Sequence, residues 1–378
     1  MCKKKMILII DASRNRSGGA RIHLDNFLNV SDPYKYGYKK VIVYSHRELI
    51  SNLESKPWLV KINPFWLNSN IFSQFFWQIF ILPFICWKSG GFLLTADGSS
   101  LNFISPQVRM VRDLLSFEPV GMSSQSSFLG RMRLYIMRKV HVYGCNKAKG
   151  VIFQTKYAAK ELSLNGVSNK NLVIIPHGIP HSFIGLSDSG TKKNIRDKWN
   201  LIYVSPFLPY KNHLTVIEAV DLLVQKKVNL ECGFIGGGYD WLEESCRSKI
   251  ELNKSIADKF NFYGEVDQGE LRDIMKSQDI FIFASSCESF GITLLEGMAS
   301  GIPIACSNAS SMPETLGNGG IYFNPTSAKS ICDAVLTLVN DERVRDRVSY
   351  AAINKAKMFN WTDISSSTWK FISETRKS

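Results

Sequence analysis

Residues 285–313 read SSCESFGITLLEGMASGIPIACSNASSMP, and they directly follow a short apolar run. This pattern predicts a buried strand, a loop that holds Glu288, a helix that opens at Phe290-Gly291, and a second strand. A glycine at a helix start lets the backbone approach a ligand closely, and the free N–H groups there favour an anion. Glu288 in the loop and Glu296 in the helix can therefore reach two different parts of one bound molecule.

Strands and helices alternate along the chain on both sides of this stretch. Short apolar runs predict strands at residues 6–10, 41–44, 151–153 and 172–175, and again at 201–204, 230–235, 260–263, 280–283 and 302–305. The alternation predicts an α/β protein with two doubly wound, Rossmann-like domains, and a ligand held between them at the carboxyl ends of parallel strands. We expect the first domain at residues 1–185, the second at 186–355 and a last segment at 356–378, with the polar residues 187–198 as the linker.

The composition is that of an ordinary globular protein. Hydrophobic residues make up 45% and charged residues 21% of the 378 residues, which excludes disorder, collagen and coiled coil. The eight cysteines form no C-x-x-C pair, so they argue against a zinc site and suit free thiols in a reducing compartment. Of the net charge of +13, most lies in residues 1–185, which hold 24 Lys and Arg against 9 Asp and Glu. We expect this half to face an anionic partner, and no nucleic-acid recognition module is apparent.

The Glu288 segment resembles the signature of a known enzyme family. Glu288-Ser289-Phe290-Gly291 followed by Leu295-Glu296-Gly297 is similar to the E-x7-E motif of retaining glycosyltransferases of family four, the group-one glycosyl transferases. The resemblance implies the GT-B architecture, with two domains that face each other across a cleft and a C-terminal helix that crosses back to the first. It implies that Glu288 lies against the donor sugar and that Glu296 binds the ribose hydroxyls. By the same resemblance, Phe290, Gly291 and Ile292 open the helix that holds the departing phosphates.

Shorter motifs occur in the family's order along nearly the whole chain. The glycine loop SGGA at 17–20 follows the first strand, and the amides of Gly18 and Gly19 can approach a diphosphate without a side chain in the way. Tyr263 belongs to a segment that resembles the strand end beside the nucleotide base. We expect His177 to be a packed loop histidine and not a catalytic base. Further segments that resemble the family are residues 176–179, 235–238 and 359–361.

Two positions depart from the family pattern. Lys211 follows a predicted strand and resembles the family's basic diphosphate site, but Pro206 stands where the family usually has an arginine, five residues before the lysine. In the first domain, Arg112 occupies the position of a histidine that many relatives carry, and Asp113 keeps the adjacent acid. Arginine cannot act as a base at neutral pH, so Arg112 would either hold phosphate or sugar hydroxyls or form a structural ion pair with Asp113. The nearby turn that begins at Asp97 is a further candidate close to the acceptor, although turn formation explains it better.

The resemblance implies a retaining hexosyltransferase. It would move a sugar from a UDP- or GDP-linked donor to a hydroxyl of a lipid-linked glycan, in surface polysaccharide biosynthesis of the O-antigen or lipopolysaccharide type. Glu288 and Asp113 are the candidate catalytic residues. Two alternatives stay open: a nucleotide-sugar epimerase of the same architecture, and a non-catalytic sugar- or lipid-binding protein in which Pro206 and Arg112 mark lost activity.

We expect no cofactor and no metal ion. The chain contains no D-x-D sequence and no cluster of histidines and cysteines with the spacing of metal ligands. Lys211 and the amides of the glycine loop and helix start can supply the positive charge that a metal ion would otherwise provide.

An aromatic segment and a basic, amphipathic one predict a location at a membrane. Residues 71–87 are rich in Phe, Ile and Trp but are interrupted by polar residues and Pro83, so we expect a buried or surface-lying helix and not a membrane span. Residues 131–139 interleave four basic residues, Arg131, Arg133, Arg138 and Lys139, with large apolar ones. No export signal is convincing, because the apolar run after the N-terminal lysines is too short. We therefore expect a cytoplasmic protein that binds peripherally to the anionic inner face of the plasma membrane.

Overall fold

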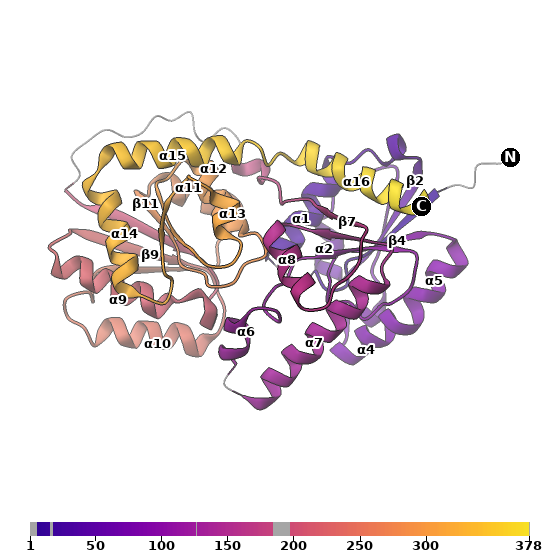
Figure 1. The fold of residues 1–378 in the computed structure, drawn as a ribbon, viewed down its shortest axis with the longest axis horizontal. Coiled ribbons are helices and arrows are strands. Elements are labelled where there is room, and N and C mark those ends of the chain that lie inside the picture. Colours follow the sequence, from indigo (N-terminus) through magenta and orange to yellow (C-terminus); the bar gives the residue numbers. More distant parts are fainter. Residues whose placement is uncertain (1–5, 16–17, 126, 184–196, 378) are drawn as a thin grey trace. The chain divides into compact units, whose positions relative to one another are not determined.

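The computed structural model describes residues 6–15, 18–125, 127–183 and 197–377. The chain forms two compact units, coloured by sequence in Figure 1: unit 1 is made of residues 1–178 and 360–378, and unit 2 of residues 179–359. The last helix therefore belongs to unit 1, although it follows unit 2 in the sequence. Most of the predicted linker, 187–198, lies outside the described residues.

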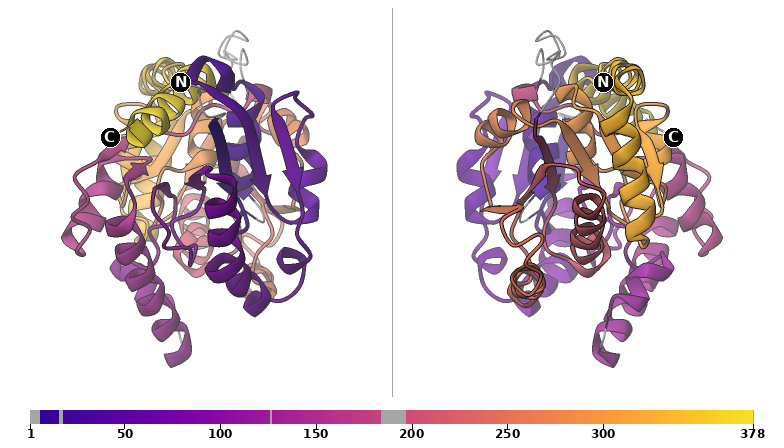
Figure 2. Two further views of the ribbon diagram at one scale, coloured as in Figure 1. Left: turned by 90° about the vertical axis from the view of Figure 1, so that its right-hand side faces the viewer. Right: turned by 90° about the vertical axis from the view of Figure 1, so that its left-hand side faces the viewer.

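Unit 1 contains a parallel sheet of seven strands in the order β3-β2-β1-β4-β5-β6-β7, seen in the left view of Figure 2. The strands are β1 Met6–Asp11, β2 Tyr38–Tyr44, β3 Leu59–Ile62, β4 Phe92–Thr95, β5 Gln107–Val111, β6 Gly150–Phe153 and β7 Leu172–Ile174. The helices are α1 Gly18–Asn29, α2 Arg47–Asn52, α3 Phe65–Asn68, α4 Ile71–Phe76, α5 Leu82–Ser89, α6 Pro119–Ser123, α7 Phe128–Lys147, α8 Lys156–Leu164 and α16 Trp361–Lys377. A 3-10 helix, η1 Pro33–Tyr36, and a π-helix, η2 Trp77–Ile81, complete the unit, and η2 joins α4 to α5.

Unit 2 contains a parallel sheet of six strands in the order β10-β9-β8-β11-β12-β13. The strands are β8 Trp199–Val204, β9 Leu230–Ile235, β10 Phe260–Gly264, β11 Ile280–Phe283, β12 Ile304–Ser307 and β13 Ile321–Phe323. The helices are α9 His213–Gln225, α10 Asp240–Glu251, α11 Gln268–Lys276, α12 Ile292–Ser300, α13 Met312–Leu316, α14 Ala328–Asn340 and α15 Glu342–Ala356, with short turns η3 His181–Phe183 and η5 Pro209–Lys211.

The side chains of β8 show why unit 2 is covered on both faces of its sheet. Leu201 and Tyr203 belong to one buried hydrophobic cluster, and Ile202 and Val204 belong to the other. Because successive residues of a strand point to opposite faces, a strand that is apolar at every position must be buried on both. The prediction of two parallel-sheet α/β domains is confirmed.

Four strands were not among the predicted ones: β3, β4, β5 and β13. β4 begins only two residues after the apolar helical stretch that ends at Ser89, so hydrophobicity alone does not separate the strand from the helix. β3 and β13 lie at the two edges of their sheets and are short, at four and three residues, with few buried side chains. Such strands leave a weak apolar pattern in the sequence.

Helix α16 is anchored in unit 1 by Trp369. This side chain is fully buried, its ring stacks on Phe27 of α1 with centroids 5.5 Å apart, and its Nε1 donates a hydrogen bond to Ser31 Oγ at 2.7 Å. Trp361, at the first position of the helix, packs against Gly178, where an added Cβ would lie 2.6 Å from the indole ring. The packing of two tryptophans, Trp361 at the start of α16 and Trp369 near its middle, therefore holds this returning helix in unit 1.

Candidate functional site

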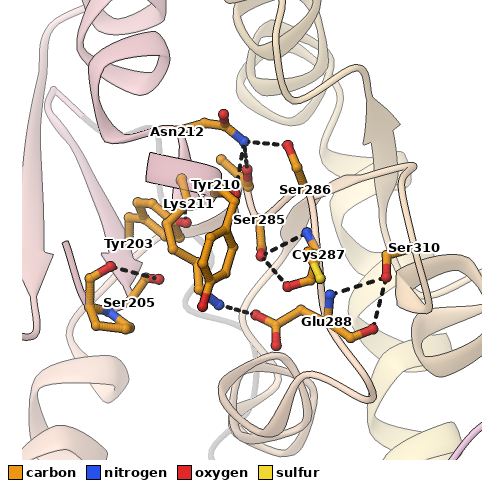
Figure 3. A network of polar contacts seen from close by, with 12 residues as sticks. Tyr203, Ser205, Tyr210, Lys211, Asn212, Ser285, Ser286, Cys287, Glu288 and Ser310 are labelled. Atoms are coloured by element: carbon orange, nitrogen blue, oxygen red, sulfur yellow. Dashed lines mark hydrogen bonds and ion pairs between the residues drawn. The ribbon is translucent and has the colours of Figure 1, made fainter. Parts of the chain in front are cut away.

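In unit 2, a buried lysine and a glutamate meet beside two neighbouring strands (Figure 3). Lys211 belongs to the loop that follows β8, and Glu288 belongs to the loop that follows β11. Because β8 and β11 are paired in parallel, their carboxyl ends lie at the same edge of the sheet. The Nζ atom of Lys211 forms an ion pair with Oε1 of Glu288, and only 7% of Lys211 is exposed. The structure thus brings together two of the residues that the sequence singled out from segments 77 positions apart.

A network of hydrogen bonds joins the loop of Lys211 to the loop of Glu288. Asn212 adopts a left-handed conformation with φ of 57°, and its Nδ2 donates to the carbonyl of Ala284 and to Ser286 Oγ, both at 2.7 Å. The N–H of Ser286 donates in turn to the carbonyl of Tyr210 at 2.8 Å. On the other side, Tyr203 OH donates to the carbonyl of Lys211 at 2.6 Å. The lysine is therefore held from both sides before any ligand arrives.

The backbone of Glu288 is held by Ser310. The N–H of Glu288 donates to Ser310 Oγ at 3.1 Å, and the same hydroxyl donates to the Glu288 carbonyl at 2.8 Å. Ser310 itself has a positive φ of 54°, which is unusual for a residue other than glycine. This reciprocal contact fixes the position of the glutamate, so its side chain reaches Lys211 from a rigid loop.

Helix α12 begins directly after this loop. Gly291 precedes it with φ of 84°, a conformation that favours glycine, and the N–H groups of the first helical turn from Ile292 onward have no partner within the helix. Phe290 is 2% exposed, and its ring packs edge-on against Phe359 with centroids 5.4 Å apart. The side chain of Phe290 therefore serves packing, and a contact with a donor would come from its backbone.

Glu296 lies inside α12 and is 2% exposed. Its Oε1 accepts a hydrogen bond at 3.0 Å from Nε2 of Gln268, the first residue of α11. Burial raises the pKa of Glu296 to about 8, so the carboxyl is largely protonated at neutral pH. The sequence analysis did not identify Gln268, because nothing in the local pattern distinguishes it from any polar residue at a helix start.

The other predicted residues of unit 2 take structural positions. The turn of Gly236 and Gly238, with φ of 136° and 143°, packs so closely on the backbone of the β8 loop that a side chain at either position would clash with it. Pro206 lies in that same loop and is exposed. Tyr263 is half-exposed on β10, the edge strand, where its ring covers Gly233. Its predicted place beside a nucleotide base stays a prediction.

In unit 1, Arg112 binds the start of the glycine helix. Gly18 and Gly19 open α1, while Ser17 lies outside the described residues. The guanidinium of Arg112 donates to the carbonyl of Gly19 at 2.7 Å and to that of Ala20 at 3.3 Å. Burial lowers the pKa of Arg112 to about 10, which still leaves it cationic at neutral pH. This contact was not predicted, and it gives Arg112 a role in holding the glycine helix.

Asp113, directly after Arg112, is exposed, and its carboxylate accepts a hydrogen bond from the N–H of Leu115 at 2.8 Å. Asp97, at the end of β4, accepts from the N–H of Ser99 at 2.7 Å, which is the turn geometry that the sequence favoured. Burial raises the pKa of Asp97, but hydrogen bonds from Ser99 and nearby positive charges outweigh it, so the pKa lies below its usual value. Asp97 is therefore ionised at neutral pH.

A buried polar network behind these loops was missed by the sequence analysis. Asp11, the last residue of β1, accepts hydrogen bonds from Ser13, Ser100 and Asn102. Arg109 is fully buried and donates to the carbonyls of Gly98, Ser100 and Asn102. The sequence offered one signal of this network, namely charged residues within or at the end of apolar runs, as at Asp11 and Arg109.

His177 is a packed histidine, as predicted. It is fully buried, its ring lies 4.9 Å from Trp361 and 5.1 Å from His23 between centroids, and its Nδ1 lies 2.7 Å from the carbonyl oxygen of Gly178. Burial lowers its pKa to about 3, so the ring is neutral at physiological pH. This environment suits a structural role at the end of unit 1.

Comparisons with known proteins bear on both units. Residues 189–355 match the family model described as Glycosyl transferases group 1. The O-antigen chain mannosyltransferase B of Escherichia coli is 22% identical over 273 residues, which is 71% of each chain. The solved structure of HepE from Anabaena with UDP superposes with a TM-score of 0.74 at 16% identity, covering 98% of this chain and all of that one. WaaG, a glycosyltransferase involved in lipopolysaccharide biosynthesis, superposes with a TM-score of 0.71 at 14% identity, covering 97% and 99%. These likenesses confirm the predicted GT-B fold.

The raised pKa of Glu296 gives a prediction about stability. Its folded-state pKa of about 8 lies above that of the unfolded chain, so the unfolded state binds fewer protons between about pH 4 and pH 8. Glu296 should therefore lower the free energy of unfolding as pH rises through this window, by at most about 1.4 kcal/mol per pH unit. Glu296→Gln, which mimics the neutral form, should become progressively more stable than the wild type from pH 5 to pH 8 in urea unfolding.

Glu244→Gln serves as the control for this experiment, because Glu244 is exposed in the same unit. The difference in the free energy of unfolding between this variant and the wild type should stay nearly constant with pH. If the difference in the free energy of unfolding between Glu296→Gln and the wild type were equally independent of pH, the protonated state of Glu296 would be contradicted.

Proposed function

Because residues 189–355 match the model of the group-1 glycosyl transferases, we propose that this protein transfers a sugar from a nucleotide diphosphate donor to a hydroxyl acceptor. The observation that carries the proposal is the ion pair between the buried Lys211 and the partly exposed Glu288, beside the N-terminus of α12. A cation and a row of free N–H groups suit a diphosphate, and an adjacent carboxylate suits sugar hydroxyls. The UDP bound in the HepE structure supports a nucleotide as the donor's carrier.

In this proposal the donor spans the edge of the unit 2 sheet. Its diphosphate lies between Lys211 and the first turn of α12, and its sugar lies against Glu288. The ribose hydroxyls bind Glu296, whose orientation is set by the hydrogen bond from Gln268. When the diphosphate binds, it replaces Glu288 as the partner of Lys211, and the freed carboxylate then turns to the sugar.

Charge stabilisation supplies most of the catalysis in this proposal. As the glycosidic bond breaks, negative charge grows on the leaving diphosphate, and preorganised donors at fixed positions stabilise it without rearrangement. A diphosphate is already a good leaving group, so no general acid is required. The resemblance to retaining enzymes implies that the acceptor attacks on the leaving-group face, and the anomeric configuration of the donor is then kept.

The acceptor side of the proposal rests on unit 1. Asp113 is exposed beyond the carboxyl end of β5, where its carboxylate can orient an acceptor hydroxyl. Arg112 holds the glycine helix, whose Gly18 and Gly19 amides can contribute to phosphate binding. The likeness to an O-antigen chain mannosyltransferase supports a hexose as the transferred unit and a surface-polysaccharide glycan as the acceptor. A lipid carrier on this glycan is part of the proposal.

The assay that tests this function is a panel of UDP- and GDP-linked sugars, screened first for binding and then for turnover with lipid-linked acceptors. Transfer with retained configuration is the expected result. Release of an epimerised sugar without any acceptor would identify an epimerase instead. Binding of a sugar nucleotide without turnover on any acceptor would favour a non-catalytic protein.

The two glutamates should differ in kinetic effect. Glu296→Ala removes a contact made equally in the ground state and the transition state, so it should raise the Kd for the nucleotide about 10- to 100-fold. Glu288→Ala removes a contact to the reacting sugar, so it should mainly lower kcat, by a similar factor. Calorimetric binding of the nucleotide and initial rates separate the two effects.

The exposed Glu244 provides the matched control, because Glu244→Ala should leave both constants unchanged. If Glu288→Ala and Glu296→Ala both kept wild-type affinity and turnover, the assignment of the donor site would be wrong.

We further propose that transfer needs no divalent metal ion. The described residues contain no group of three or more His, Cys, Asp and Glu side chains that could hold one. Lys211 and the N–H groups of α12 take the charge-stabilising role. Activity should therefore be unchanged in excess chelator, and a loss that magnesium or manganese restores would refute the proposal.

A further inference from the structure

The helical stretch from Ile71 to Ser89 carries its aromatic side chains on the outside. Phe72, Phe80 and Trp87 are 77%, 60% and 79% exposed. Together with α3, this stretch forms a surface strip that we call the aromatic ridge. Its members are Phe65, Trp66, Phe72, Phe76, Phe80, Phe84 and Trp87. From Phe72 onward they recur every three or four residues, so they share one face of the helical stretch. An exposed apolar strip of this length marks an interaction surface.

The polar residues of the same stretch point inward. Gln74 and Gln78 are fully buried, and their Nε2 atoms donate to the carbonyl and the hydroxyl of Ser13 at 2.6 and 2.7 Å. Trp77, between them, is also fully buried and packs against Tyr44. These contacts fix the rotation of the helix and force the ridge outward. The exposed aromatic face is therefore built into the fold and is not a consequence of fraying.

These inward contacts also argue against a membrane span. By length and composition alone, the stretch Ile71–Ser89 could cross a membrane, and only 22% of its most apolar window is buried. Crossing would remove Gln74 and Gln78 from Ser13 and place both amides in hydrocarbon without partners. The geometry fits a helix that lies along a lipid surface with its outer face in contact.

A second amphipathic surface comes from α7. The first buried residue of this helix is His141, so its N-terminal half carries exposed apolar side chains. The stripe consists of Phe128, Leu129, Met132, Tyr135 and Ile136, each more than 40% exposed. With about 100° of rotation per residue, Arg131 and Arg133 fall on the two borders of this stripe. Both arginines and Lys139 are exposed.

The two surfaces belong to the same unit and reach the same edge of it. In Figure 1 the labelled helices α4 and α7 both lie at the lower edge of unit 1. We propose that the aromatic ridge and the α7 stripe together form a docking surface for an anionic lipid membrane. Aromatic and aliphatic side chains enter the headgroup region, and the bordering arginines pair with lipid phosphates.

Charge favours a membrane over a second copy of this chain as the occupant. Neither residues 65–89 nor residues 128–147 contain an Asp or Glu, whereas α7 alone carries five Lys and Arg, so two copies of this face would repel each other. An anionic lipid surface attracts the same charge. The docking surface itself does not depend on the proposed function. Only its use rests on that function: membrane binding would bring unit 1 to a lipid-linked acceptor at the cytoplasmic face of the plasma membrane.

The test is flotation of the full chain with vesicles of neutral lipid alone or of neutral and anionic lipid, at low and high salt, without donor or acceptor. The wild type should float with anionic vesicles at low salt and be released at high salt, because salt screens the charges. Phe72→Ser/Trp87→Ser should weaken the partitioning at least about 10-fold. Arg131→Gln/Arg133→Gln should weaken it about 30-fold at low salt.

Matched controls lie in unit 2. Tyr239 and Trp241 are an exposed, stacked aromatic pair, and Arg343 and Arg347 are exposed on α15. Tyr239→Ser/Trp241→Ser and Arg343→Gln/Arg347→Gln should float as the wild type does. All four variants should keep wild-type nucleotide affinity, which separates this test from that of the proposed function.

Three results would overturn the inference. The first is absence from anionic vesicles at low salt, or flotation of the ridge variant at the wild-type level. The second is a wild-type dimer in solution that the ridge variant converts to a monomer without any vesicle binding, which would identify a second copy as the partner. The third is resistance of the wild type to both high salt and alkaline extraction, which would indicate a membrane span.

Discussion

The ion pair between Lys211 and Glu288 is the interaction around which the candidate site of unit 2 is arranged. Removing two charges from water costs free energy that their mutual attraction returns only in part, so a buried pair is a poor source of stability. Here the surrounding loops nevertheless hold both partners rigidly, through Asn212 on one side and Ser310 on the other. A site that holds Lys211 buried and Glu288 only partly exposed, both from fixed loops, is suited to exchange the carboxylate for a ligand of the same charge.

The elements around the ion pair are arranged to receive such a ligand. Parallel pairing of β8 and β11 brings the two loops to one edge of the sheet, and α12 starts at the same edge with its free N–H groups. A diphosphate placed there would meet a cation and a helix N-terminus together. Because burial raises the pKa of Glu296 to about 8, its carboxyl is largely neutral and would add little negative charge near a bound diphosphate.

The sequence predicted those parts of the site that depend on local pattern. Glu288, Gly291 and Glu296 follow from a strand, a loop and a helix start within one short segment, and the resemblance to group-one glycosyl transferases assigned their roles. Lys211 followed from its position after a strand. The fold class followed in the same way, from the alternation of apolar runs with amphipathic stretches, although the edge strands β3 and β13 and the interior strands β4 and β5 were missed.

Contacts between distant segments could not be predicted. Gln268 reaches Glu296 from another helix, and Arg112 reaches Gly19 across 93 positions. The inward direction of Gln74 and Gln78 depends on Ser13, which is more than 60 positions earlier. The apolar composition of residues 71–87 indicated a buried or surface-lying helix, but only the tertiary contacts determine which face is exposed.

The most direct test of the central claim is a double-mutant cycle on Lys211 and Glu288, with the affinity for UDP and GDP measured by calorimetry. Lys211→Met should weaken the binding of the preferred nucleotide by about 10- to 100-fold, because it removes a charged contact to phosphate. Glu288→Gln should bind that nucleotide at least as tightly as the wild type, because Lys211 no longer has to leave a carboxylate, and the double variant should be as weak as Lys211→Met alone. If Glu288→Gln instead weakened nucleotide binding as much as Lys211→Met, with additive effects in the double variant, the exchange of partners at Lys211 would be contradicted.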